Sequence, residues 1–164
     1  MKKIYGATER QDGLYKIGRN KWELIYGFGK DSEEAETGYN YRERYSRKPT
    51  PDEVKAVLIS QINEHTDEKI ISGFVWKGIN VWLSTENQIN FKAAYDLAVQ
   101  TNGSILPIKF KLGEDADGNP LYYTFADVDT FTEFYVAAVN HVTTCINEGW
   151  QEKDNIDLTL FQGE

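Results

Sequence analysis

The sequence contains few of the residues that mark a disulfide-stabilised domain, a metal centre or a membrane protein. Among 164 residues there is one cysteine, Cys145, so no internal disulfide can form, and there are only two histidines. No run approaches the roughly 18 apolar residues that span a bilayer, and no apolar run of signal-peptide length follows Met1. We therefore expect a soluble protein that stays in a cytoplasm until it is assembled.

Positive charge is scarce and unevenly distributed. The chain has 18 Lys and Arg against 26 Asp and Glu, a net charge of −8. Residues 1–50 carry 11 basic and 8 acidic side chains, whereas residues 51–164 carry 7 and 18. This balance argues against nucleic acid as the partner of the larger part, because phosphates would be repelled. The acidic surface has either a specific role or only the common one of keeping the protein soluble.

Three capping boxes organise residues 51–164, each at the start of an apolar pattern with helical spacing. They are Thr50 with Glu53, Thr85 with Gln88, and Thr130 with Glu133. The segments between them, 70–84 and 105–125, are rich in β-branched and aromatic residues around short turns, which is typical of hairpins. We predict an α+β fold: an N-terminal β-hairpin segment, then helix, hairpin, helix, hairpin, helix.

In the hairpin predicted over residues 70–84, strand alternation assigns the side chains to two faces. The simplest register places four apolar side chains on one face: Phe74, Trp76, Ile79 and Val81. Val75, Asn80 and Trp82 then lie on the opposite face. With one tryptophan on each face, one side of the ribbon is covered, and Trp82 is left available to contact a partner.

Two residue patterns that could bind a metal ion or act in catalysis have simpler structural explanations. His141 and Cys145 are four residues apart on the predicted last helix, but no CxxC or HExxH pattern supplies further zinc ligands, so packing of a buried thiol is favoured. Asp115, Asp117 and Asn119 lack the glutamate of a calcium loop, which favours a plain turn. No catalytic residue, metal ligand or cofactor is predicted.

We expect residues 1–50 to be a segment distinct from the body formed by residues 51–164. Two alternating runs, Leu14 to Ile17 and Trp22 to Tyr26, predict a hairpin. A lone hairpin is only marginally stable in water, so it must dock on something. Residues 30–50 show no clear helical or strand period and are expected to form a linker.

The linker interleaves tyrosine with arginine, two residue types enriched at interface hot spots. The alternative is a solvated linker whose tyrosines lie on the body of the same chain. On the first interpretation the segment binds a partner protein, or the acidic body of a neighbouring copy in a homo-oligomer. The predicted partner-binding residues are Trp22, Tyr39, Tyr41, Arg42, Arg44, Tyr45 and Arg47, with Trp82 of the body.

Four stretches carry a family resemblance: INEHTDEKI, SGFVWKG, ENQINFKAAYDLA and FYVAAVNHVTTCINEGWQEKDNID. Together they resemble a small domain of unknown function that occurs in bacteriophage and prophage genes, often beside tail or tail-fibre genes. The resemblance covers approximately residues 52–158 and leaves the first fifty residues outside. Its motifs are structural, so no functional residue is carried over.

The resemblance implies a non-enzymatic phage structural or assembly protein, associated with the tail or tail fibre. Its partners would be other virion or tail proteins, or further copies of itself, with no nucleic acid and no membrane. It would be located in the virion, or in the host cytoplasm before assembly. Two alternatives stay open: a tail-fibre assembly chaperone, and a phage-encoded enzyme or host-protein inhibitor with an acidic surface.

Overall fold

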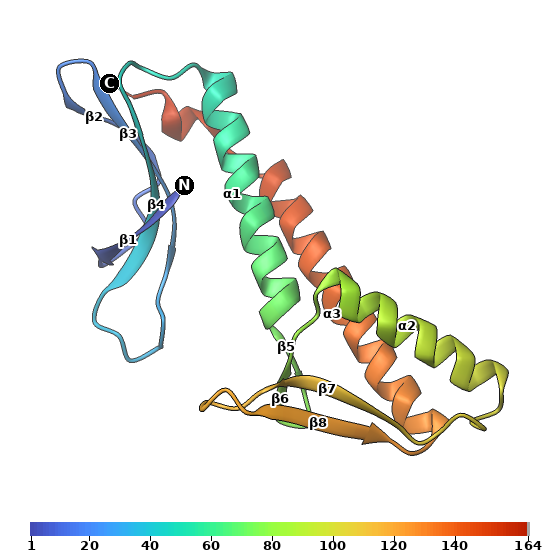
Figure 1. The fold of residues 1–164 in the computed structure, drawn as a ribbon. Helices are drawn as coiled ribbons and strands as arrows, with labels where there is room; N and C mark the ends of the chain where they lie inside the picture. Colours follow the sequence, from blue (N-terminus) through green and yellow to red (C-terminus); the bar gives the residue numbers. More distant parts are fainter. Residues whose placement is uncertain (164) are drawn as a thin grey trace. The chain divides into compact units, whose positions relative to one another are not determined.

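The computed structural model describes residues 1–163, which form two compact units (Figure 1). Unit 1 consists of Met1–Asn63 and the C-terminal segment from Glu152 onward, and unit 2 is Glu64–Gln151. The division therefore does not fall at residue 50, where the sequence suggested one. The mixed α and β fold with antiparallel sheets is confirmed.

Residues 1–163 contain eight strands, three α-helices and one short 3-10 helix. The strands are β1 (Lys2–Ala7), β2 (Gly13–Gly18), β3 (Lys21–Gly29), β4 (Gly38–Tyr45), β5 (Phe74–Trp76), β6 (Ile79–Val81), β7 (Ile108–Glu114) and β8 (Pro120–Phe125). The helices are α1 (Pro51–Ser72), α2 (Thr85–Gln100), α3 (Val128–Asp154) and the 3-10 helix Leu158–Phe161.

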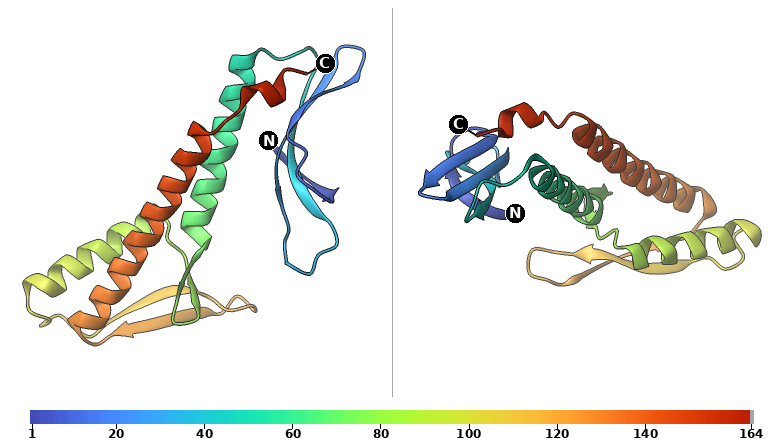
Figure 2. Two further views of the ribbon diagram at one scale, coloured as in Figure 1. Left: turned by 180° about the vertical axis from the view of Figure 1, so that it is seen from behind. Right: turned by 90° about the horizontal axis from the view of Figure 1, so that it is seen from above.

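Unit 1 is built on a four-stranded antiparallel sheet in the order β1-β4-β3-β2, drawn in blue to cyan in Figure 2. The hairpin of β2 and β3 forms where the alternating runs predicted it. The expectation of a linker over residues 30–50 was wrong for Gly38–Tyr45, which forms the strand β4. A signal for it was present, because Tyr39, Tyr41 and Tyr45 are spaced by two and four residues. Amphipathic tyrosine alternating with arginine conceals a strand period that aliphatic residues would have shown.

The core of unit 1 unites the sheet with the first turns of α1 and the 3-10 helix. Its buried residues are Leu14, Trp22, Leu24, Tyr26, Val54, Leu58, Ile62 and Phe161. The apolar stripe of α1 is thus covered by side chains from the first fifty residues. These residues are therefore part of one core with residues 51–63, which explains why the units do not divide at residue 50.

The capping box that begins α1 is confirmed. The Thr50 backbone N–H donates to Glu53 Oε2 at 2.8 Å, and the Glu53 N–H donates to Thr50 Oγ1 at 3.3 Å. The Arg47 guanidinium also binds the Glu53 carboxylate. The hydrogen bond from Arg47, followed by that from the Thr50 N–H, lowers the pKa of Glu53 to about 2. Glu53 therefore stays ionised at the positive end of the helix dipole.

The other two helices begin before the predicted caps. In α2 the cap is Ser84, whose hydroxyl accepts the Asn87 N–H at 3.2 Å. In α3, Asp127 Oδ1 accepts the Thr130 N–H at 2.7 Å, so the helix starts ahead of Thr130. Ser and Asp are N-cap residues as good as Thr, and each lies just upstream of the box that the sequence suggested.

Unit 2 combines two hairpins with α2, most of α3 and the end of α1. The register of β5 and β6 pairs Phe74 with Val81 and Trp76 with Ile79, as predicted. The turn between β7 and β8 is closed by Asp115, whose carboxylate accepts the backbone N–H groups of Asp117 and Asn119. This is the plain turn that the sequence favoured.

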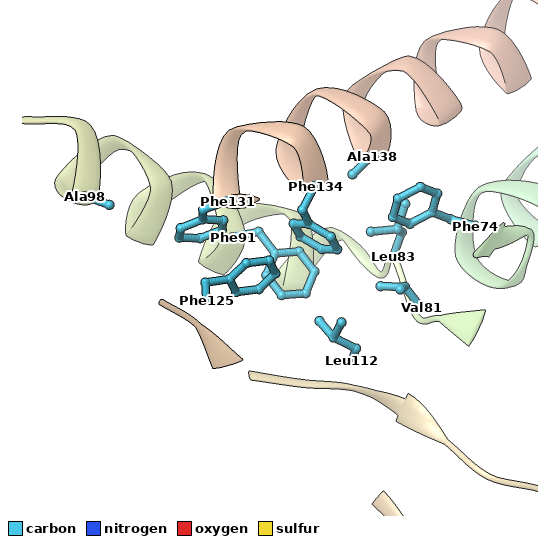
Figure 3. Packing of buried hydrophobic residues seen from close by; sticks show 10 residues of the cluster. All are labelled: Phe74, Val81, Leu83, Phe91, Ala98, Leu112, Phe125, Phe131, Phe134 and Ala138. Atoms are coloured by element: carbon cyan, nitrogen blue, oxygen red, sulfur yellow. The ribbon is translucent and has the colours of Figure 1, made fainter. Parts of the chain in front are cut away.

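Aromatic rings dominate the core of unit 2 (Figure 3). Phe131 and Phe134 from α3 meet Phe91 from α2 and Phe125 from β8. The ring centroids of Phe125 and Phe131 are 4.4 Å apart in a stacked arrangement, and Phe134 lies 5.1 Å from Phe91 and 5.0 Å from Phe125. Such ring pairs add to the free energy of area burial and fix the helices on the hairpins.

Candidate docking site

Trp82 combines a fixed backbone with an exposed ring. Its backbone N–H donates to the Leu112 carbonyl oxygen at 3.0 Å, and its own carbonyl accepts from Asn87 Nδ2 at 2.8 Å. The residue is nevertheless 61% exposed. An aromatic side chain on a pinned backbone loses little entropy when it contacts a partner. The prediction that Trp82 lies on the open face of its hairpin thus agrees with its exposure.

A groove of about 720 Å³ adjoins this tryptophan within unit 2. Its lining comes from the end of α1, from β6, from the start of α2 and from β7: Ile71, Ser72, Asn80, Val81, Trp82, Ser84, Asn87, Lys111, Leu112, Gly113 and Glu114. Buried Val81 and Leu112 contribute apolar atoms. The groove therefore offers apolar contact beside a few polar groups, which is the usual composition of a binding site.

Gly113 determines how closely β6 and β7 approach at this groove. A Cβ atom at position 113 would lie 2.1 Å from the Asn80 carbonyl oxygen, a distance that no side chain tolerates. Glycine therefore permits the contact between the two hairpins beside the hydrogen bond that holds Trp82 on Leu112. Sequence reasoning missed Gly113, because nothing local to it indicates the neighbouring strand.

A second hollow lies between α2 and α3, with a volume of about 340 Å³. Apolar side chains make up most of its lining, among them Leu83, Phe91 and Val142. The exposed side chains of Ile89 and Val139 stand at this hollow. Unit 2 thus has two concave surfaces with exposed apolar groups, and only the first carries a tryptophan.

The structure places Trp22 and Tyr45 in the interior of unit 1. Trp22 is 7% exposed and belongs to the core, and Tyr45 packs against that core. The Lys48 ammonium lies 5.0 Å from the centroid of the Trp22 ring, a cation–π distance. These two predicted anchors therefore stabilise the fold of unit 1 and present little surface to a partner.

Tyr39 and Tyr41 form an aromatic cluster with Tyr5 on the same sheet. Ring centroids of Tyr39 lie 5.6 Å from those of Tyr5 and 5.7 Å from those of Tyr41, both edge-on. The Lys3 ammonium stands 3.6 Å from the Tyr39 centroid and also binds Asp31. Arg47, another of the predicted partner-binding residues, forms an ion pair with Glu53 of the same chain.

Arg42 and Arg44 share one acidic partner that sequence reasoning missed. Arg44 Nε donates to Glu23 Oε1 at 2.7 Å, and Arg42 Nη1 donates to Glu23 Oε2 at 3.2 Å. Glu23 is only 5% exposed. An acidic residue within the apolar run of β3 was a signal for such a pair, because a buried carboxylate requires a cation or several donors.

The pair of His141 and Cys145 is occupied by structural contacts. His141 Nε2 lies 3.0 Å from the Lys69 carbonyl oxygen and 3.7 Å from Cys145 Sγ. Burial raises the pKa of the Cys145 thiol, which holds it in the protonated, weakly nucleophilic form. Within residues 1–163 no three His, Cys, Asp or Glu side chains are grouped so as to hold a metal ion. The same residues include no helix with the length and apolarity of a membrane span.

These features define an α+β protein of two compact units, the second of which has an exposed tryptophan beside a groove. A family model described as a domain of unknown function (DUF4376) matches residues 53–162, and the chain belongs to this family. The match contains all of unit 2 but excludes the sheet of unit 1. Searches of curated proteins and of solved structures found no match.

Proposed function

We propose that this protein is a non-enzymatic docking protein that takes part in phage assembly, as a tail- or tail-fibre-associated component. The observation that carries the docking role is the exposed Trp82 beside its groove. Tryptophan is the residue type most enriched in interface hot spots, where it fills a partner's pocket or covers its apolar side chains. The groove supplies the complementary apolar surface for side chains of the partner.

The phage setting is supported by the resemblance of the four sequence stretches to a domain from phage and prophage genes. In this proposal the protein contacts virion or tail proteins and is located in the virion, or in the host cytoplasm before assembly. A tail-fibre chaperone would share the docking surface but would be missing from purified mature particles. Mass spectrometry of such particles separates the two roles.

An inhibitor of a host protein is the second candidate function, and the charge of unit 2 favours it. Residues 64–151 carry 5 Lys and 12 Asp or Glu, a net charge of −7. A strongly acidic surface attracts basic partners and repels nucleic acid. Under this alternative, the protein captured by the chain from infected cells would be encoded by the host and not by the phage.

Trp82→Ala should weaken partner binding by about 30-fold or more, which corresponds to a hot-spot loss of about 2 kcal/mol. Stability should change by less than about 0.5 kcal/mol, because the ring is exposed. The measurement is affinity capture of phage proteins from infected cells by the full chain, quantified by mass spectrometry.

Trp150→Ala is the matched control, since Trp150 also lies in unit 2 and is 60% exposed. It lines neither of the two hollows described above. Capture that survives Trp82→Ala, or that falls equally in both variants, would argue against a contact centred on Trp82.

A further inference from the structure

We propose that a hollow on the outer face of the β1–β4 sheet is an anion-binding pocket that receives a carboxylate from a partner protein. The hollow has a volume of about 430 Å³ and is lined by Lys2, Ile4, Glu23, Arg42, Glu43 and Arg44. Strand alternation places Glu23 on the face of β3 opposite to Leu24, which faces the core of unit 1. The pocket therefore opens away from that core.

The two arginines at this hollow are held in place before any ligand arrives. Glu23 accepts a hydrogen bond from each of them, one on each carboxylate oxygen. Arg42 is fixed a second time, because its Nε donates to Asn40 Oδ1 at 2.8 Å. Asn40 is itself fully buried. A guanidinium oriented by buried neighbours binds a planar anion with little loss of side-chain entropy.

Both arginines keep donors that their internal partners do not use. Arg44 bonds Glu23 only through Nε, so within residues 1–163 its Nη1 and Nη2 atoms have no partner, and its side chain is 75% exposed. Arg42 uses Nε and Nη1 and leaves Nη2. Lys2, paired with Arg42 across β1 and β4, adds an ammonium with no hydrogen bond or ion pair in the described part of the chain. The hollow therefore contains unused N–H donors from two guanidinium groups and from one ammonium group.

The charge of the pocket favours an anionic ligand. Three cations, Lys2, Arg42 and Arg44, share the hollow with the Glu23 carboxylate, which leaves a net charge of +2. Glu43 also lines the hollow, but it pairs with Leu24, so its side chain lies on the opposite face of the sheet. A docking partner supplies the anion as Glu or Asp side chains, and one or two carboxylates offset this charge. Arginine binds a carboxylate through two parallel N–H···O bonds, which matches the pair of free Arg44 donors.

This inference rests on the proposed function in one respect, since it names the chemical group that the first unit receives from a docking partner. Glu and Asp side chains of a protein are the source to which it commits. The site itself is independent of Trp82, because its lining comes entirely from unit 1. A failure of the pocket and a failure of the Trp82 contact can therefore be told apart.

The test is an NMR titration of the full purified chain with sodium acetate, exchanged against chloride at constant ionic strength. The observed signals are the Nε–H resonances of arginine. Saturable shifts are expected at Arg42 and Arg44, with affinity in the millimolar range. Arg44→Gln should weaken acetate binding about tenfold, the effect of losing charge-assisted hydrogen bonds. Arg44→Lys should also weaken it, because lysine keeps the charge but loses the forked donors.

Arg19→Gln is the matched control, since it removes the same charge from an exposed arginine that does not line the hollow. It should leave the titration unchanged. The proposal is overturned if Arg44→Gln binds acetate as tightly as the original chain, or if Arg19→Gln causes an equal loss. Tighter binding of inorganic phosphate than of acetate at the same ionic strength would reassign the pocket to phosphate and would also overturn it.

Discussion

Replacing Phe134 by alanine should destabilise unit 2 by about 3–5 kcal/mol, the range measured when large aromatic side chains are removed from protein cores. Phe134 is completely buried, and its ring contacts the rings of Phe74, Phe91, Phe125 and Trp76. These neighbours come from β5, α2 and β8. A cavity at Phe134 therefore weakens the attachment of several elements to α3 at once.

The measurement is denaturant unfolding of the full chain, followed by hydrogen exchange to assign the loss to unit 2. Amides of α2 and of the β7–β8 hairpin should lose protection. Val136→Ala is the control on the same helix, because Val136 is exposed and its truncation should change stability by less than about 0.5 kcal/mol. If Phe134→Ala had as small an effect as Val136→Ala, the aromatic cluster would not be the core that stabilises unit 2.

Deleting residues 1–50 should unfold unit 1 while leaving the core of unit 2 intact. No buried residue of the unit 2 cluster precedes Phe74, whereas the unit 1 cluster loses half of its buried members, among them Trp22 and Leu24. The stripe of Val54, Leu58 and Ile62 on α1 is then exposed to water. Each such side chain loses about 1.5–3 kcal/mol of burial free energy, which residues 51–63 cannot recover alone.

Hydrogen exchange of the truncated chain measures this outcome by segment. Amides of residues 51–63 should exchange rapidly, and those of α2 and the buried part of α3 should stay protected. The exposed stripe should also promote self-association, as exposed apolar patches do. Full protection of residues 51–63 without the first fifty residues would show that the sheet is not required for their fold. The sequence alone suggested that outcome.

The sequence predicted the elements that local chemistry determines. Thr50 with Glu53 begins α1 because both groups of the capping box lie within one turn of chain. The register of Phe74 with Val81 follows from the short turn and strict alternation. Strand β4 was missed, because its tyrosines and arginines have partners on β1 and β3 that are distant in sequence. Helices and strands could be predicted where neighbouring residues determine them, but not where a strand forms only by pairing with strands that are distant in sequence.

The candidate site could be predicted only in part for the same reason. Trp82 was identified because hairpin alternation assigns it a face. The groove beside it, the close approach at Gly113 and the role of Glu23 depend on which strands become neighbours. Composition selected Trp22, which the structure buries in the unit 1 core, and Arg47, which binds Glu53 at the start of α1. Residue types common at interfaces also stabilise cores and helix starts, and composition does not distinguish these uses.

Photo-cross-linking from position 82 in infected cells tests the docking role most directly. A benzophenone side chain replaces Trp82 in the full chain, and the same side chain at Asp96, an α2 residue whose side chain is 44% exposed, serves as the control. We expect one dominant adduct with a phage virion or assembly protein at position 82 and none at position 96. Equal labelling at both positions, or no adduct at position 82 while the protein is present in assembling particles, would contradict it.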